Sequence, residues 1–186
     1  MRIISGNFKG KKISLPDDKH TRPLRDMVKE SIFNLIEHSN KVNSKINDSI
    51  ILDLFSGSGS FGLECISRGA KKVIFIENYF EALKILNKNI LYLNVKEKSK
   101  IIREDCFKFF NYDKVFDEKF KIIFMDPPYK EKKINYLIEK IKEKKILDKN
   151  GVIIIHRHKL DDVQISQKLK ILDERKYGIS KIIIGN

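Results

Sequence analysis

Short apolar runs alternate with amphipathic segments along most of this chain. Compact runs of Ile, Val, Leu and Phe, bounded by turn residues, predict buried strands at 50–55, 72–77, 100–103, 121–125 and 151–155. Between these runs, apolar residues recur at the spacing of one helix face and predict helices at 61–68, 82–93 and 134–141. Because strands that alternate with helices form parallel sheets with both faces covered, the pattern predicts a Rossmann-like α/β fold.

The two ends of the chain follow a different pattern. Residues 170–175 and 180–184 have strand character and are separated by Tyr177-Gly178, which predicts an antiparallel pair. Weak alternation from Arg2 to Leu15 predicts a short hairpin with a basic tip, and helical spacing from Met27 to Ile36 predicts a helix. We therefore expect a seven-stranded sheet, mostly parallel with an antiparallel C-terminal strand, preceded by a short N-terminal hairpin and helix.

Length and hydropathy are those of a globular protein. At 186 residues the chain can form one domain with a full core and a small appendage. No apolar run is long enough to cross a bilayer, and the first residues lack the apolar core of a signal peptide. We therefore expect a cytoplasmic protein with no membrane partner, and a monomer. Cys65 and Cys106 form no CxxC pair and are expected to be buried free thiols.

Positive charge exceeds negative charge. With 38 Lys and Arg against 25 Asp and Glu, the net charge is +13, which suggests a polyanionic partner. The abundance of Lys, Ile and Asn also fits the mutational bias of an A/T-rich genome, so the position of the charges says more than their number. A group of cations precedes the alternating region and is interpreted as an RNA-binding cluster: Lys9, Lys11, Lys12, Arg22 and Arg25. Any one of them alone is better explained as a solvated surface charge.

The most informative motif is Asp126-Pro127-Pro128-Tyr129, which closes the apolar run 122–125. The two prolines stop the strand and stiffen the loop, because proline fixes φ and restricts the residue before it. Within four residues the loop offers a carboxylate, a free backbone carbonyl and an aromatic face. This combination suits a flat substrate that carries an NH2 group, although an ordinary strand-ending turn would explain the motif alone equally well.

A glycine-rich turn follows the first strand of the alternating region. Gly57, Gly59 and Gly62 satisfy GxGxxG, so a nicotinamide or flavin site must be considered. Glu77 ends the second strand, where a carboxylate can accept hydrogen bonds from the ribose hydroxyls of a dinucleotide or of S-adenosylmethionine.

Three details favour S-adenosylmethionine over a dinucleotide. Asp53 lies four residues before the first glycine and suits a ligand with an ammonium and a sulfonium group. Asp105, after the third strand, supplies an acceptor for an adenine amino group. The loop that begins at Asp126 has no role in hydride transfer. Each acid alone would be a strand-end cap or a solvated carboxylate, but together they follow strands that end at the same edge of the sheet.

These motifs together resemble the class I S-adenosylmethionine-dependent methyltransferases that methylate amino groups. The segments TRPLRDMVKESIFN (21–34), DLFSGSGSFGLE (53–64), SRGA (67–70), DPPY (126–129) and RKYG (175–178) further resemble the RsmD family. That family methylates N2 of a guanine in bacterial small-subunit ribosomal RNA. The resemblance implies S-adenosylmethionine as cofactor, S-adenosylhomocysteine as product, no metal, and 16S ribosomal RNA within an assembled small subunit as partner.

The resemblance also assigns roles to residues of this chain. It implies a catalytic loop formed by Asp126, Pro127, Pro128 and Tyr129. It implies cofactor contacts from Asp53, Phe55, Ser56, Gly57, Gly59, Glu77, Asn78, Asp105, Cys106 and Asp126. We expect residues 1–45 to form an RNA-binding extension and residues 46–186 to form the methyltransferase domain.

The chain departs from this pattern at two places. Leu24 and Arg25 stand where small polar residues are expected, and His156-Arg157-His158 follows the fifth strand of the alternating region where an acidic residue is expected. We interpret His156 and His158 as surface residues near the pocket rim. With His20, they show no metal-ligand spacing.

The predicted chemistry is transfer of a methyl group to an exocyclic amine. Asp126 and the carbonyl of Pro127 would accept the two N–H groups, and Tyr129 would stack on the base. The target should be a loop base or a flipped base, because a paired guanine cannot enter such a pocket. The alternatives are an adenine-N6 methyltransferase on RNA or DNA, a protein-glutamine methyltransferase, an NAD-dependent oxidoreductase and a non-catalytic RNA-binding module.

Overall fold

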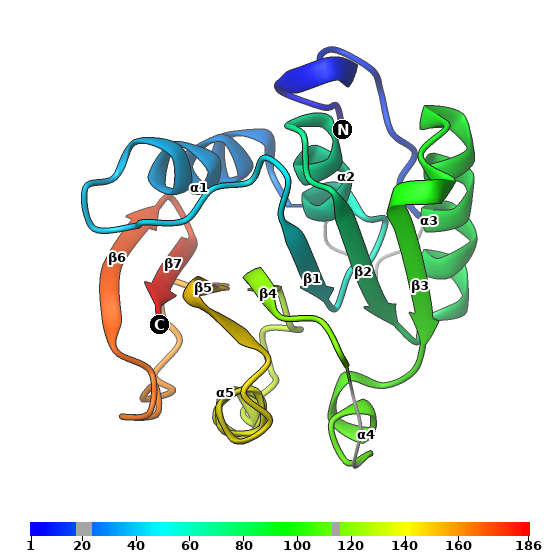
Figure 1. Cartoon of the computed structure of the whole chain (residues 1–186). Helices are drawn as coiled ribbons and strands as arrows, with labels where there is room; N and C mark the ends of the chain where they lie inside the picture. Colours follow the sequence, from blue (N-terminus) through cyan, green and yellow to red (C-terminus); the bar gives the residue numbers. More distant parts are fainter. Residues whose placement is uncertain (18–23, 113–115) are drawn as a thin grey trace.

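The computed structural model describes residues 1–17, 24–112 and 116–186. Its described strands form one sheet in the order β3-β2-β1-β4-β5-β7-β6. The strands are β1 (Ile50–Leu54), β2 (Lys72–Glu77), β3 (Ser99–Arg103), β4 (Phe120–Met125), β5 (Leu147–His158), β6 (Ile171–Tyr177) and β7 (Ser180–Gly185). Strands β1 to β5 pair in parallel, and β7 runs antiparallel to both β5 and β6 (Figure 1). The predicted fold class is confirmed.

The register of the central strands fixes where the two key motifs meet. Asp53 of β1 lies opposite Phe75 of β2 on one side and opposite Phe124 of β4 on the other. Leu54, the last residue of β1, pairs with Met125, the last residue of β4. The glycine-rich turn and the Asp126 loop therefore leave neighbouring strands at the same edge of the sheet.

Helices cover both faces of the sheet. The first face carries α1 (Asp26–His38), α2 (Ser60–Ser67) and α3 (Phe80–Leu93), and the second carries α4 (Cys106–Phe109) and α5 (Ile134–Glu143) (Figure 1). Alternate strand residues pack on opposite faces, as the two-residue period of a strand requires. Ile51 and Phe75 belong to the core under α2, whereas Leu52 and Ile74 belong to the core under α5.

The first seventeen residues fold back as a hairpin-like segment. Arg2 and Lys12 form an antiparallel bridge around the short 3-10 helix η1 (Gly6–Phe8). Both carboxylate oxygens of the buried Glu64 accept backbone N–H groups of this segment, from Ile4 at 2.8 Å and from Ser5 at 2.9 Å. The segment is thereby fixed to α2. The prediction that residues 1–45 form a separate RNA-binding extension stays a prediction.

Apart from shifts of one or two residues at the ends of other elements, the structure differs from the sequence prediction at α4 and at both ends of β5. The short helix α4 was not predicted, and its start is capped by the Asp105 side chain. Strand β5 begins four residues before the predicted run 151–155 and ends three residues after it. The polar residues 148–150 concealed its start, and its end was concealed because His156-Arg157-His158 carries no apolar signal. The predicted N-terminal motif begins at residues 21–23, which lie outside the described residues.

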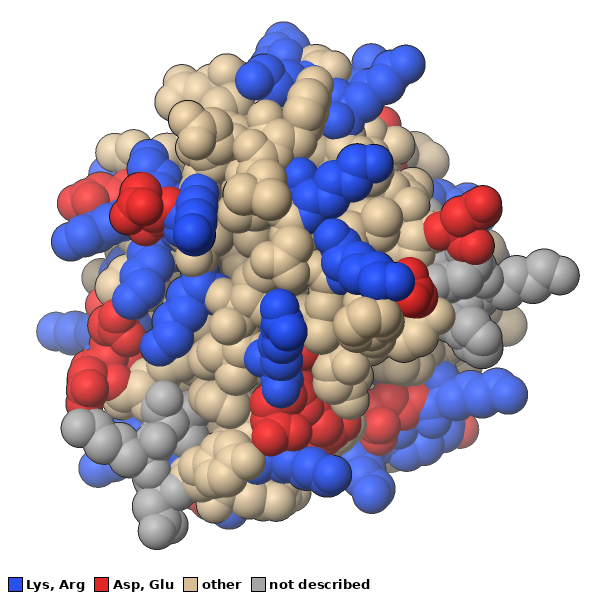
Figure 2. Space-filling model, turned by 90° about the vertical axis from the view of Figure 1, so that its right-hand side faces the viewer, with Lys and Arg blue, Asp and Glu red and all other residues tan. Residues whose placement is uncertain are grey.

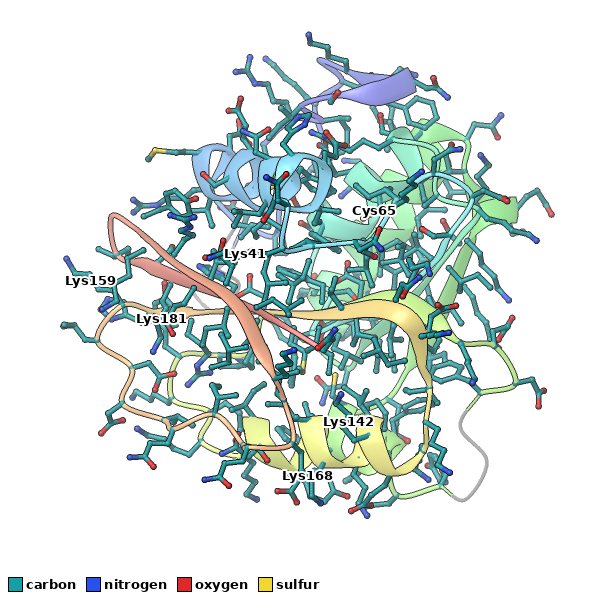
Figure 3. All side chains as sticks on the ribbon, turned by 60° about the vertical axis from the view of Figure 1, so that its left-hand side comes forward. Lys41, Cys65, Lys142, Lys159, Lys168 and Lys181 are labelled. Atoms are coloured by element: carbon teal, nitrogen blue, oxygen red, sulfur yellow. The ribbon has the colours of Figure 1, made fainter. Side chains whose placement is uncertain are left out.

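Both cysteines are buried free thiols, as predicted (Figure 3 shows Cys65 inside the molecule). Burial raises the pKa of both the Cys65 and the Cys106 thiol, so neither is a ready nucleophile. None of the helices in the described part of the chain combines the length and the apolar surface needed to span a bilayer.

Candidate active site

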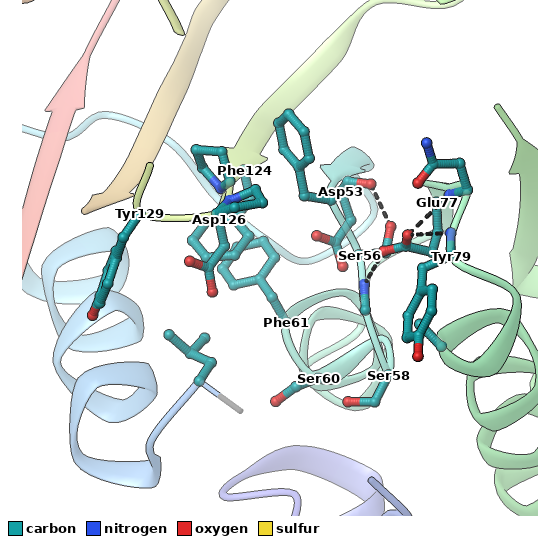
Figure 4. A pocket seen from close by; sticks show the side chains of 17 residues that line it. Asp53, Ser56, Ser58, Ser60, Phe61, Glu77, Tyr79, Phe124, Asp126 and Tyr129 are labelled. Atoms are coloured by element: carbon teal, nitrogen blue, oxygen red, sulfur yellow. Dashed lines mark hydrogen bonds between the residues drawn. The ribbon is translucent and has the colours of Figure 1, made fainter. Parts of the chain in front are cut away.

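A cavity of about 470 Å³ opens at the carboxyl ends of β1, β2 and β4. Its walls come from the turns after β1 and β2, from the loop after β4 and from Leu24, which precedes α1 (Figure 4). The lining residues are Leu24, Asp53, Phe55, Ser56, Gly57, Ser58, Ser60, Phe61, Glu77, Asn78, Tyr79, Ala82, Phe124, Asp126, Pro127, Pro128 and Tyr129. The turn and the loop singled out from the sequence therefore share one cavity.

The turn after β1 has a backbone that few residues can adopt. Phe55, Gly57 and Gly59 all have positive φ, at 57°, 54° and 81°. A Cβ atom on Gly59 would lie 2.4 Å from Cδ1 of Leu86, so α3 leaves no space for a side chain there. Ser56 Oγ donates to the Asp53 carbonyl at 2.6 Å. The turn is thus closed on itself and exposes backbone groups to the cavity.

Asp53 is almost completely buried, with 1% of its surface exposed. Its Oδ2 accepts the Gly62 N–H at 3.0 Å, which aims the carboxyl group across the start of α2. Burial raises the pKa of Asp53 well above its usual range, and the nearby charges of Asp126 and Glu77 raise it further. Three carboxyl groups thus face one partly closed space, which favours a cationic ligand.

Glu77 ties together the turns after β1 and β2. Its Oε2 accepts the N–H of Gly57 at 2.8 Å, and its Oε1 accepts the N–H groups of Asn78 at 2.9 Å and Tyr79 at 2.8 Å (Figure 4). A carboxylate has about four lone-pair sites, so acceptor capacity remains for a ligand hydroxyl.

The loop after β4 is held from behind by Arg157. This side chain is 1% exposed and donates to the carbonyls of Pro128 at 3.3 Å, Tyr129 at 3.2 Å and Glu131 at 2.7 Å. Its Nε also pairs with Asp161. One guanidinium group therefore donates to three loop carbonyls, of which that of Pro128 also accepts the Glu131 N–H at 2.9 Å.

His156 contacts Asp126 directly, which corrects the prediction that it lies on the surface. Only 3% of His156 is exposed. Its Nδ1 lies 2.8 Å from Asp126 Oδ1, and its Nε2 lies 2.9 Å from Ser180 Oγ. The prediction failed because β5 extends to His158 beside β7, and the loop after β4 lies against these last three residues, which looked like a polar strand end. His158 is half-buried, with its ring 4.9 Å from that of Tyr129.

Three predicted cofactor residues do not line the cavity: Gly59, Asp105 and Cys106. Asp105 accepts the N–H groups of Phe107 and Lys108 as the cap of α4, and Asn78 Nδ2 reaches its other oxygen at 3.4 Å. Cys106 is buried in the core beneath α5. Asp105 therefore reaches the cavity only through Asn78, and Cys106 is part of the core.

Other lining residues had not been predicted: Leu24, Ser58, Ser60, Phe61, Tyr79, Ala82 and Phe124. Ser58, Ser60 and Tyr79 are direct sequence neighbours of predicted cofactor residues, and Phe61 and Phe124 lie two positions from one, so their signal was a position beside a motif. Leu24 and Ala82 are the exceptions, because only the tertiary fold brings them to this cavity. Among the described residues, no group of three or more His, Cys, Asp or Glu side chains is arranged to hold a metal ion.

The prediction that five cations form one RNA-binding cluster stays a prediction. Lys9, Lys11 and Lys12 are exposed on the hairpin-like segment, beyond the edge where β1 and β2 begin (Figure 1). Arg25 is exposed next to Leu24, at the cavity. Arg22 lies outside the described residues.

Proteins of known sequence and structure resemble this chain over nearly its whole length. YlbH of Bacillus subtilis is 32% identical over 185 residues, which cover 99% of this chain and 97% of YlbH. The protein named ribosomal RNA small subunit methyltransferase D from Haemophilus influenzae is 31% identical over 180 residues, which cover 96% and 90% of the two chains. Its namesake from Buchnera aphidicola (host Acyrthosiphon pisum) is 34% identical over 161 residues, with 87% and 80% covered.

Solved structures of similar sequence share the fold of this chain. The Haemophilus influenzae protein HI0767 superposes with a TM-score of 0.78 at 29% identity and covers 99% of this chain and 96% of its own. A conserved hypothetical protein from Streptococcus pyogenes reaches 0.72 at 27% identity, with 85% and 94% covered. The sequence profile of the family described as Conserved hypothetical protein 95 matches residues 1–186, and the chain belongs to this family.

Proposed function

We propose that this protein transfers a methyl group from S-adenosylmethionine to N2 of a guanine in 16S ribosomal RNA. The observation that carries the proposal is the shared cavity, in which Asp53 and Glu77 face Asp126 across neighbouring strand ends. The relatives named ribosomal RNA small subunit methyltransferase D support ribosomal RNA as the substrate class.

The cavity suits S-adenosylmethionine by charge and by shape. Asp53 would face the ammonium and sulfonium end of the ligand, because its buried carboxyl group has no cationic side chain paired with it among the described residues. Glu77 would accept the ribose hydroxyls. Phe55, Ser56 and Gly57 would contact the ligand along the turn, which the Gly59 N–H closes by its bond to the Ser56 carbonyl, and Asn78, bonded to Asp105, would meet the adenine.

The residues of the Asp126 loop would prepare the amine. When bound, S-adenosylmethionine supplies an electrophilic methyl group and leaves as S-adenosylhomocysteine. The Asp126 carboxylate and the Pro127 carbonyl would accept the two N–H groups of the exocyclic amine, so that its lone pair points along the line of attack. Tyr129, which the preceding Pro128 helps to hold in place, would stack on the base and exclude water. Asp126 would accept the proton that the amine loses.

The proposal is tested by methyl transfer to isolated small subunits. Subunits from a strain that lacks this protein are incubated with the protein and methyl-labelled S-adenosylmethionine, and the nucleosides are identified by mass. We expect label in N2-methylguanosine, and more of it with assembled subunits than with naked 16S RNA. Label on adenine would support the adenine-N6 alternative, and label only on protein would exclude RNA as the substrate. Binding of NADH without binding of S-adenosylmethionine would support the oxidoreductase alternative.

Cofactor affinity is expected to rise with pH. The raised pKa of Asp53 means that the free protein keeps this proton to a higher pH than an ordinary aspartate would, and a cationic ligand must displace it. Below that pKa, affinity should therefore increase by up to about tenfold for each pH unit and then level off. Calorimetry in buffers with different ionisation enthalpies should record proton release on binding. In Asp53→Asn the pH dependence should disappear along with most of the affinity, and a pH-independent affinity of the wild-type protein would contradict this role.

Helix α3 offers a path for RNA between the cavity and the hairpin-like segment. It begins beside the cavity residue Tyr79 and ends near Tyr92, about 18 Å further along at 1.5 Å per residue. Lys84 lies over the exposed ring of Phe80 at 4.5 Å, and Lys11 lies 5.7 Å from the exposed ring of Tyr92. Figure 2 faces this side of the molecule and shows Lys and Arg side chains interspersed with uncharged surface. Cations beside exposed aromatic rings suit a single-stranded RNA segment.

Removal of the hairpin cations should weaken RNA binding without slowing chemistry. For the triple variant Lys9→Ala, Lys11→Ala, Lys12→Ala, the slope of log affinity against log salt should decrease by about 2 to 3, or roughly 0.7–0.9 for each phosphate that is no longer neutralised. The rate of methyl transfer at saturating RNA should not change. The matched control removes three exposed lysines on the β6 side, Lys168, Lys170 and Lys176, and should keep the salt slope. Equal effects of the two triple variants would contradict the path along α3.

A further inference from the structure

The last three residues of β5 all contact the Asp126 loop, although none of them was expected to take part in the site. His156 contacts Asp126, Arg157 binds loop carbonyls, and His158 lies edge-on to Tyr129. His156 is the member of this group that reaches the proposed reacting centre through a single hydrogen bond. It is also the member whose hydrogen-bonding directions are fixed by its partners.

The partners of His156 determine where its proton lies. An ionised Asp126 carboxylate can only accept, so the 2.8 Å contact requires Nδ1–H to donate to Oδ1. In the neutral ring, Nε2 is then an acceptor, and the Ser180 hydroxyl donates to it across 2.9 Å. The two hydrogen bonds therefore run in one direction, from the Ser180 hydroxyl through the imidazole to the Asp126 carboxylate.

The fold leaves these hydrogen-bonded side chains little freedom to move. His156 is 3% exposed and Ser180 is 4% exposed, and the two residues belong to the neighbouring strands β5 and β7. His156 lies opposite Ile182 in this pair, so the imidazole is held by two strands and by both of its nitrogen atoms. The Asp126 side chain, which accepts the last of these hydrogen bonds, is 16% exposed and lines the cavity.

We propose that His156 is a positioning residue for methyl transfer. Its bond to Oδ1 fixes the Asp126 carboxylate so that Oδ2 remains free to accept an N–H of the target amine. Asp126 fixes the tautomer of the imidazole, and the bond between Nε2 and the Ser180 hydroxyl holds the rotation of the ring. The inference rests on the proposed role of Asp126 and adds to it two residues, from β5 and β7, that do not touch the substrate.

Three substitutions of His156 separate positioning from packing. In Asn, the side-chain nitrogen is attached to Cγ, as Nδ1 is in His, so His156→Asn can still donate to Asp126. His156→Gln places its amide one bond further out, where it can reach Ser180 and not Asp126, and His156→Leu removes both bonds. The readouts are the single-turnover rate of methyl transfer, the affinity for S-adenosylmethionine and the thermal midpoint.

We expect the Gln and Leu variants to lose about 10- to 100-fold in the rate, which corresponds to one hydrogen bond to a charged group. Their affinity for the cofactor should not change, since His156 does not line the cavity. His156→Asn should recover most of the rate. A purely structural role would instead lower the thermal midpoint and the rate together in all three variants.

Each remaining outcome is decisive. If His156→Asn is as slow as the Leu variant, or if the Leu variant reacts at the wild-type rate, the positioning role is wrong. If the Gln and Leu variants do not fold, Ser180→Ala decides, because it removes one hydroxyl and should slow transfer at unchanged cofactor affinity. A wild-type rate in Ser180→Ala would then overturn the inference. Failure of the wild-type protein to methylate RNA in the same assay would contradict the proposed function instead.

Discussion

Replacement of Asp126 by asparagine is expected to lower the rate of methyl transfer by about 10²- to 10³-fold, the range found when one group that stabilises a transition state is removed. Asparagine has nearly the shape of aspartate and can still accept the His156 N–H through its oxygen. It lacks the negative charge that would stabilise the amine as the nitrogen becomes cationic, and it cannot take the departing proton. The loss should therefore appear in the chemical step and not in folding.

Single-turnover transfer to small subunits at saturating cofactor measures this loss. The matched control is Asp162→Asn, which changes a carboxylate with 85% of its side chain exposed in a surface ion pair with Lys132. The control should react at the wild-type rate. Because the charge of Asp126 helps to raise the pKa of Asp53, that pKa should fall in Asp126→Asn. Undiminished transfer by Asp126→Asn would exclude Asp126 as the group that prepares the amine.

Replacement of Arg157 by methionine is expected to lower the free energy of unfolding by about 3–5 kcal/mol, the cost of breaking a buried ion pair by removing one partner. Methionine keeps an unbranched apolar stem but removes the guanidinium donor from three loop carbonyls, of which that of Pro128 keeps the Glu131 N–H. It also leaves Asp161, whose side chain is 5% exposed, without its cation. Urea denaturation with and without S-adenosylmethionine measures the loss.

The pH dependence of this loss has a definite sign. Burial by itself would raise the pKa of Asp161, but the hydrogen bond from Arg157, the N–H of Val163 and the positive charge of Arg157 outweigh it and lower the pKa. The stabilisation is therefore present above the ordinary pKa of aspartate and is lost as the pH falls through the lowered value. In acid, the difference between the wild-type protein and Arg157→Met should shrink.

The control for Arg157 is an exposed arginine. Arg2 pairs with Asp26 at 3.5 Å, and 69% of its side chain is exposed. Surface pairs of this kind contribute about 0–1 kcal/mol, so Arg2→Met should unfold at nearly the same urea concentration as the wild-type protein. If Arg157→Met were equally stable, the loop would owe its conformation to its prolines alone.

The strand and helix pattern could be predicted because it depends on local periodicity. The runs that became β1, β2 and β4 are apolar at consecutive positions, which is what a strand covered on both faces requires. Asp53 and Glu77 could be placed at the functional edge because each occupies the end of such a run. Phe55 and Asn78 line the cavity because each follows one of these strand ends in the sequence.

Roles that depend on contacts between distant segments could not be predicted. Asp105 looked like a free acceptor, but it caps α4, which the sequence pattern did not reveal. Leu24 lies far in sequence from the turn after β1, yet it lines the same cavity. Sequence separation does not measure distance across a folded sheet.

The sequence by itself determined the α/β class, the cofactor-type turn and the stiff loop after β4, because each follows from the periodicity and backbone restrictions of adjacent residues. Only the tertiary structure decided that β4 lies beside β1, which brings Asp126 to face Asp53. It also decided that β7 covers the end of β5, which turns an apparently exposed histidine into a buried link between Ser180 and Asp126. Strand order and burial arise from packing among segments far apart in the chain, and a local pattern does not contain that information.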